Sequence, residues 1–144
     1  MLIFKRILFY ILSFTWGFIM SFIGLWPIIV CAFMGRVHVF HGRLYVTIGK
    51  DWGGLELGCF FVCGENCQTD HLRAHECGHG LQNIILGPLM PFIICIPSAI
   101  RYWYREIIWR KNREKYYTLP EYDAIWFEGW ASNWGHKYIL TDKA

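Results

Sequence analysis

The sequence predicts an α+β protein in which an N-terminal transmembrane helix, residues 1–35, precedes a single small domain, residues 36–144. Three features lead to this prediction. An uncharged apolar run lies near the N-terminus, short stretches of alternating apolar residues follow it, and two helical segments come after those. A chain of 144 residues has room for one hydrophobic core of ordinary size.

The composition also indicates a membrane protein. Hydrophobic residues make up 55% and charged residues 17% of the chain, against roughly 45–50% and about 25% in a typical soluble domain. This apolar content excludes intrinsic disorder. The formal net charge is only +3 and no nucleic-acid recognition motif accompanies it, so we expect no nucleic-acid partner. Unpaired cysteines in apolar runs favour a reducing, cytoplasmic location for the folded part.

The transmembrane helix is predicted from residues 7–35, which contain no Asp, Glu, Lys or Arg. About 20 such residues span a bilayer. A cleaved signal peptide is disfavoured, because its apolar region has about 7–15 residues and ends at a small-residue cleavage site. Ser13, Gly17 and Ser21 are spaced four residues apart, and this stripe would allow a second helix to approach closely.

A short antiparallel β-meander is predicted after the apolar run. Residues 37–48 alternate between apolar and polar residues around a turn at His41 and Gly42, and residues 55–62 form a third strand. Cysteines at positions 59, 63 and 67, with His71, recur at every fourth residue. The glycines at 58 and 64 interrupt any helix there, so a metal site built from these thiols is disfavoured and their role stays open.

The first helix of the domain is predicted to begin at Thr69 or Asp70 and to continue to Leu86, where Gly87 and Pro88 end it. Residues 84–100 form an apolar segment that prolines interrupt, and we expect it to be re-entrant, interfacial or buried. Residues 101–115 mix Arg and Lys with Trp and Tyr, which suits the lipid headgroup layer, so a lipid bilayer is an expected partner. A last helix is predicted from Pro120 to about Lys137.

The clearest chemical motif is His75-Glu76-Cys77-Gly78-His79, an H-E-x-x-H pattern on the predicted helix. Residues four apart share a helix face, so both imidazoles can bind one Zn²⁺ ion, and Glu76 can act as general base. Catalytic zinc takes a third protein ligand. Downstream candidates are Glu121, Asp123, Glu128 and His136.

Glu128 is the favoured third ligand, because a carboxylate between Phe127 and Trp130 needs a compensating partner. Asp123 could instead serve only as a helix cap, and an ordinary ion pair of Glu128 with an arginine is an alternative. The group that would stabilise the transition state stays open among Tyr122, His136 and His71.

Together these motifs resemble the gluzincin type of H-E-x-x-H zincin-like metallopeptidases, and most of all a little-characterised group of small bacterial membrane-associated or toxin-associated zincin-like proteins. The shared elements, over about residues 52–135, are HECGHGLQN, Gly87-Pro88, Ile96-Pro97-Ser98 and the helix from Trp126 to Ala131. The resemblance implies zinc bound by His75, His79 and Glu128, with Glu76 as base. The family often has Asp after the small residue, where this chain has Ser132, so the outer partners of the histidines stay unassigned.

We therefore expect a membrane-anchored zinc metallopeptidase that hydrolyses peptide bonds with a metal-activated water and Glu76 as general base. Its expected substrate is a peptide or protein near the membrane. Residues 84–100 should not cross the bilayer, because crossing would separate His75 and His79 from Glu128; the catalytic domain is then cytoplasmic on a single-pass anchor. The alternatives are a non-catalytic interaction or toxin-like protein with a structural metal, and an intramembrane metalloprotease.

Overall fold

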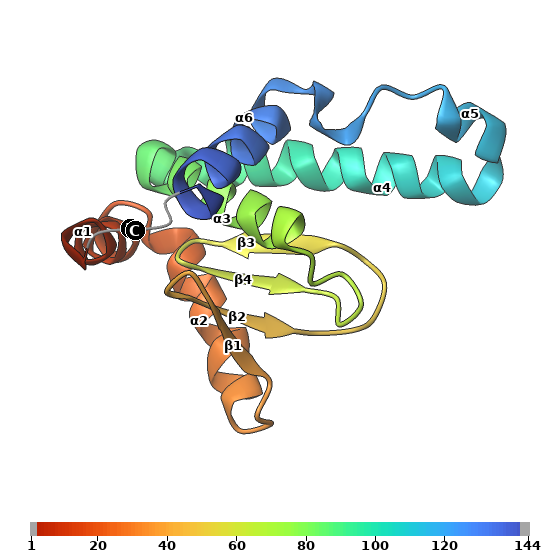
Figure 1. Cartoon of the computed structure of the whole chain (residues 1–144). Coiled ribbons are helices and arrows are strands. Elements are labelled where there is room, and N and C mark those ends of the chain that lie inside the picture. Colours follow the sequence, from red (N-terminus) through yellow and green to blue (C-terminus); the bar gives the residue numbers. More distant parts are fainter. Residues whose placement is uncertain (1–2, 142–144) are drawn as a thin grey trace.

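The computed structural model describes residues 3–141, so the outermost residues of the two predicted segments, 1–2 and 142–144, lie outside it. The chain forms helices and one sheet (Figure 1), which confirms the α+β class. In chain order the elements are α1 (Ile3–Thr15), α2 (Phe18–Ala32), β1 (Val37–Phe40), β2 (Arg43–Thr47), β3 (Gly54–Leu57), β4 (Phe60–Cys63), α3 (Asp70–Leu86), η1 (Gly87–Leu89), η2 (Pro91–Cys95), α4 (Ile96–Lys111), α5 (Arg113–Tyr117), η3 (Tyr122–Ala124), α6 (Trp126–Gly135) and η4 (His136–Leu140).

The sheet has the strand order β1-β2-β4-β3, with β2 and β4 parallel and the other two pairs antiparallel. The predicted three-stranded antiparallel meander is therefore wrong. Gly58, with φ +76°, turns the chain inside the predicted third strand and divides it into the hairpin β3–β4. Because β4 pairs with β2, β3 becomes an edge strand of the sheet.

Helices cover both faces of the sheet. On one face Val46 and Val62 join a core with Met20 and Ile28 of α2, and α2 crosses the strands on that side (Figure 1). The other face belongs to a second cluster that includes Phe61 of β4 and residues of α3. Every residue of β4 is buried, which explains why this strand is apolar throughout rather than alternating.

The predicted N-terminal transmembrane helix over residues 1–35 is wrong, because the chain bends by 100° between α1 and α2. Within residues 3–141 no single helix is long and apolar enough to span a membrane. Two bent pairs reach that length and hydropathy only together: α1 with α2, and Asp70–Leu89 with Pro91–Lys111, which bends by 115°. The predicted single-pass membrane location with a cytoplasmic catalytic domain relied on that helix and is therefore not supported either.

Contacts with α3 hold the bend between α1 and α2. The carbonyl oxygen of Gly17 accepts a hydrogen bond from Asn83 Nδ2 at 3.1 Å, and Trp16 Nε1 donates to the Ile85 carbonyl at 3.2 Å. A β-carbon at Gly17 would clash with the Asn83 side chain. Ser21 packs in the same way against Gly58 in the β3–β4 turn. The small residues of this stripe therefore allow other segments of the same chain to pack closely against them.

The helix carrying the H-E-x-x-H motif forms as predicted. The Thr69 hydroxyl caps its first turn by accepting a hydrogen bond from the backbone N–H of Leu72 at 3.1 Å, and Gly87, with φ +54°, ends it. The proline-rich segment after it folds into η1 and η2 before α4 begins. The predicted last helix is shorter than expected, because α6 starts only at Trp126, after η3.

Two glycines allow α3 and α6 to lie unusually close together. A β-carbon at Gly78 of α3 would overlap the carbonyl oxygen of Ala131, and one at Gly135 of α6 would overlap the carbonyl oxygen of Ala74. Both obstacles are backbone atoms, so neither can rotate away. This close contact brings the side chains of α6 within reach of the motif on α3.

We expect Gly78→Ala to lower the free energy of unfolding. The methyl group forces α6 away from α3, and overpacking of this kind costs about 1–3 kcal/mol, more than the about 1 kcal/mol of helix propensity that alanine adds. Urea denaturation measures the difference. Asn133→Ala, an exposed position on α6, is the control and should stay within about 0.5 kcal/mol of the wild type. Equal stability of the two variants would contradict the close packing.

Candidate metal centre

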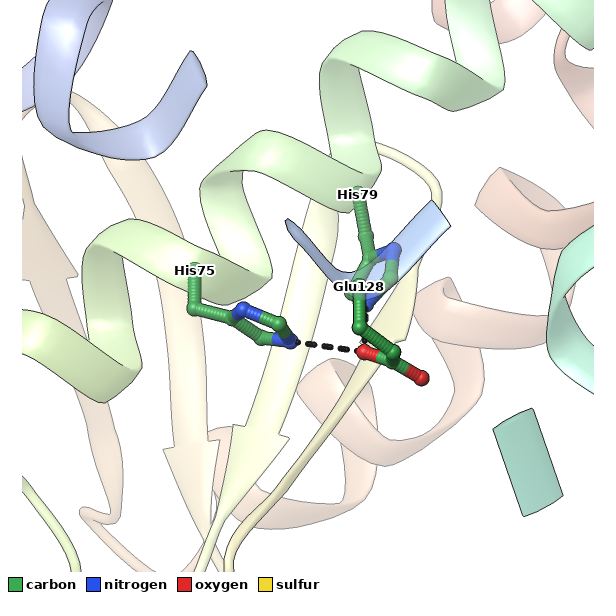
Figure 2. A group of neighbouring side chains, drawn as sticks. All are labelled: His75, His79 and Glu128. Atoms are coloured by element: carbon green, nitrogen blue, oxygen red, sulfur yellow. Dashed lines mark hydrogen bonds and ion pairs between the residues drawn. The ribbon is translucent and has the colours of Figure 1, made fainter. Parts of the chain in front are cut away.

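Three buried side chains from α3 and α6 form a group that could hold a metal ion. His75 and His79 lie four residues apart on one face of α3, and Glu128 faces them from α6 (Figure 2). One ligand atom from each residue lies within 4.8 Å of the others. Glu128 Oε2 is 3.1 Å from Nε2 of each histidine. The three residues that the sequence predicts as metal ligands thus lie together in one buried group that could hold a metal ion.

The geometry and the chemistry of these donors fit a tetrahedral metal ion. Ligand atoms about 2.0–2.1 Å from such an ion lie about 3.3 Å from one another, close to the 3.1 Å between Glu128 Oε2 and each imidazole. Burial alone would lower the pKa of His79, but its hydrogen bond to Glu128 raises it to about 9. The same contacts, from His75 and His79, hold the pKa of the Glu128 carboxyl far below its usual range, although burial alone would raise it. A positive charge is therefore favoured between the three side chains.

Ser132 and Asp123 orient the imidazole of His75. Ser132 Oγ donates its only proton to Asp123 Oδ2 at 2.5 Å, so it can only accept from His75 Nδ1, which lies 2.7 Å away. We assign the ring proton of His75 to Nδ1 on this basis. The lone pair of Nε2 is then directed at Glu128 and available to a metal.

Gln82 does the same for His79, with which it shares helix α3. Its Nε2 donates to the carbonyl oxygen of Phe127 at 2.8 Å, and this contact orients the amide so that Oε1 faces His79 Nδ1 at 2.7 Å. In the neutral imidazole that binds a metal, the ring proton of His79 is therefore also on Nδ1, and Nε2 is the ligand atom. Because Phe127 precedes Glu128, the same amide ties the ligand-bearing helices together.

Ser98 of α4 positions the carboxylate of Glu128. Its hydroxyl donates to Glu128 Oε1 at 2.5 Å and lies 3.2 Å from the Tyr122 hydroxyl. With Oε1 held in this way, Oε2 faces the two histidines. Burial, and next the charge of Glu128, raise the pKa of the Tyr122 phenol, so it remains a hydrogen-bond donor.

Glu76 lies beside this group on α3 and is buried. Its carboxylate packs against Gly54 of β3, where a β-carbon would lie 2.5 Å from Glu76 Oε1. Only glycine at position 54 leaves this space for the carboxylate. Burial raises the pKa of Glu76, an effect that the neighbouring His75 and His79 oppose.

A cavity of about 530 Å³ opens beside the three ligands. Its walls include Glu76, the edge strand β3 and Tyr122. Arg101 and Arg105 of α4 hold the segment with Tyr122 in place, donating to the carbonyl oxygens of Glu121, at 2.8 Å, and Pro120, at 2.7 Å. These cations of the basic aromatic segment thus stabilise the wall of the cavity.

The other candidates for the third ligand have different contacts. Asp123 accepts from Ser132, as described above, and Glu121 contributes a backbone carbonyl to Arg101. His136 pairs with His71, Nε2 to Nδ1, at 2.8 Å on the surface. Cys59 lies in the turn before β4 and Cys63 at the end of β4; both are in the core, where burial raises the pKa of each thiol to about 11.

Sequence reasoning missed the outer partners of the ligands. Gln82 and Ser98 are part of the motifs that carry the resemblance, but without an assigned role, and Ser132 stood out only as a departure from the usual aspartate. Asp123 supplies a carboxylate from another position in the chain, and the Ser132 hydroxyl links it to His75 by hydrogen bonds. No local pattern could reveal this, since η3 and α6 must first fold together.

Removal of the Ser132 hydroxyl should weaken metal binding without changing the number of ions bound. We expect Ser132→Ala to lower the affinity for Zn²⁺ about 10–100-fold, the usual effect of losing an outer partner, with one ion still bound per chain. Glu128→Ala should lower it further. Calorimetric titration with Zn²⁺ measures both, with Asn133→Ala as the unchanged control. If Glu128→Ala binds Zn²⁺ with wild-type affinity, a residue other than Glu128 is the third ligand.

Comparisons with protein-family models, with curated proteins and with solved structures found no match to this chain. The gluzincin-type assignment therefore stays a prediction from the motifs, and the site is interpreted from its own geometry.

Proposed function

We propose that this protein is a zinc-dependent metallopeptidase. The observation that carries the proposal is the position of Glu76: it is buried next to His75 on the helix that supplies both imidazoles, and it lines the cavity. Two neutral imidazoles and one carboxylate are a donor set suited to Zn²⁺. A structural role for the metal is less consistent with this site, because structural zinc is enclosed by four protein ligands and this group of three borders a cavity.

When bound, Zn²⁺ supplies a Lewis acid that lowers the pKa of water and polarises a carbonyl group. Glu76 acts as the general base: its carboxylate accepts a proton from the attacking water and later delivers it to the departing amine. Gly54 keeps the space that this carboxylate occupies. The two outer hydrogen-bond systems hold the histidines in one tautomer throughout.

The edge strand β3 provides the means to bind a peptide backbone. Among the described strands β3 pairs only with β4, so its other edge is available, and Gly54, Leu55 and Glu56 all line the cavity. An extended peptide can add to such an edge through main-chain hydrogen bonds. Main-chain hydrogen bonds of this kind do not depend on the sequence of the peptide. The apolar residues that line the cavity favour an apolar side chain of the substrate.

Tyr122 is the residue we assign to stabilise the developing charge on the carbonyl oxygen of the substrate. It lines the cavity, its hydroxyl is linked to Glu128 through Ser98, and its pKa is raised. His71 also lines the cavity, but its Nδ1 is engaged with His136. His136 is exposed. Of the three residues left open by the sequence, Tyr122 is thus the best placed donor.

Glu76→Gln should separate metal binding from catalysis. The amide cannot accept the proton, so we expect kcat to fall about 10²–10⁴-fold while one zinc ion per chain is retained. Hydrolysis of a mixed peptide library, followed by mass spectrometry, measures activity, and elemental analysis measures zinc. Glu114→Gln, the same change at an exposed position on α5, is the control. An unimpaired Glu76→Gln enzyme, or a zinc-loaded wild type that cleaves no peptide, would contradict the proposal.

Tyr122→Phe tests the assigned hydrogen-bond donor. Loss of one such donor lowers kcat about 10²–10³-fold, and we expect KM and zinc content to change little because the phenyl ring keeps its packing. Steady-state kinetics on a peptide from the library measure both constants. Tyr117→Phe, at an exposed position, is the control. A change confined to KM would assign Tyr122 to substrate binding instead.

A further inference from the structure

A second carboxyl group in the cavity has no role in the proposed reaction. Glu56 of β3 is only 4% exposed and lines the cavity, whose other walls include Met90, Ile94 and Cys95. Residues two apart on a strand share a face, so Glu56 lies on the same side of β3 as Gly54, toward α3. It is thus placed on the wall that carries the free strand edge.

Only one oxygen of this carboxyl group is satisfied. Oε1 accepts a hydrogen bond from the backbone N–H of Gly58 at 2.5 Å. Oε2 is buried and has no hydrogen-bond partner within residues 3–141. A buried oxygen without a partner is costly, so a ligand that supplies a donor here gains the free energy of that contact.

The charges around the cavity favour a cationic donor. Four carboxyl groups line it: Glu56, Glu76, Asp123 and Glu128. Glu128 faces the histidines and Asp123 is engaged by Ser132, and the proposed function uses Glu76. In the described part of the chain, no lining residue is Lys or Arg. Glu56 is therefore the carboxyl group left to a ligand.

Arg43, the arginine whose charge acts on Glu56, does not satisfy its free oxygen. Arg43 donates from Nη1 to the Cys77 carbonyl at 2.8 Å, and its guanidinium lies 3.9 Å from the centre of the Phe9 ring. No ion pair joins it to Glu56 among the described residues. Burial accordingly raises the pKa of Glu56 to about 8, in spite of the opposing effects of His79, the Gly58 N–H and Arg43.

We infer that Glu56 is a specificity residue that binds a primary ammonium group of the peptide substrate. The inference rests on the proposed function, since it places the substrate along β3 beside the metal ligands. The ammonium group can come from the free N-terminus of the peptide or from a lysine side chain. Both present the same donors to Glu56 Oε2. Because burial raises the pKa of Glu56, the carboxyl group gives up its proton when the ammonium group binds, and the resulting charge-assisted hydrogen bond strengthens binding about 10–100-fold.

Calorimetry on the zinc-loaded full chain at neutral pH tests this inference through binding rather than turnover. Hydroxamates serve as probes because they bind zinc and are not hydrolysed. One pair compares leucine hydroxamate with its N-acetyl form, and a second compares N-acetyl-lysine hydroxamate with N-acetyl-norleucine hydroxamate. We expect the wild type to bind the ammonium-bearing member of one pair about 10–100-fold more tightly. A preference within the first pair identifies the peptide N-terminus as the source of the ammonium group, and one within the second pair identifies a lysine side chain.

Glu56→Gln should remove that preference and leave both the zinc content and the affinity for the neutral probe unchanged. Glu114→Gln is the matched control and should retain the preference. If Glu56→Gln does not fold, Glu56→Asp keeps the charge on a shorter side chain and should show a reduced preference.

Two results would overturn the inference while the metal centre stands: neutral and cationic probes that bind the wild type equally, and a preference that survives in Glu56→Gln. A wild type that loads zinc but binds no probe would count against an open catalytic metal, and the proposed function would fail together with the inference.

Discussion

The close contact between α3 and α6 is the constraint on which the site depends. Gly78 and Gly135 remove the side chains that would hold the two helices apart, and each faces a backbone carbonyl of the other helix. Only at this separation does Glu128 of α6 lie 3.1 Å from the imidazoles of His75 and His79. Packing and chemistry are therefore coupled, because a change that widens the gap between the helices also separates the ligands.

The polar atoms around the ligands form a second layer of constraint. Ser132 and Gln82 each present an acceptor to one histidine, and each is itself oriented by a further hydrogen bond, to Asp123 and to the Phe127 carbonyl. Such chains keep the proton of each neutral imidazole on Nδ1, so that Nε2 is the atom available to an ion. The arrangement also joins α3, η3 and α6 through buried hydrogen bonds, which are costly to break in an apolar interior.

Only part of the apolar N-terminal segment packs within the fold, since most of the large apolar side chains of α1 and α2 are exposed. Phe9, Met20 and Ile28 belong to one core with Val46 and Leu57 of the sheet. A long charge-free run is typical of a membrane span, yet the same composition serves two helices that meet at 100°. The bend depends on Asn83, which is distant in sequence, and no local pattern at residues 7–35 could reveal it.

The sequence by itself determined the class of the fold, the helix with its cap at Thr69 and its end at Gly87, and the grouping of His75, His79 and Glu128. These follow from local rules: helix periodicity places residues four apart on one face, and a carboxylate among aromatic residues requires a partner. Only the tertiary structure decided the parallel pairing of β2 with β4, the bend at Gly17, the link from Asp123 through Ser132 to His75, and the buried position of Glu56. Each of these joins residues from different elements, and such contacts exist only once the elements have packed.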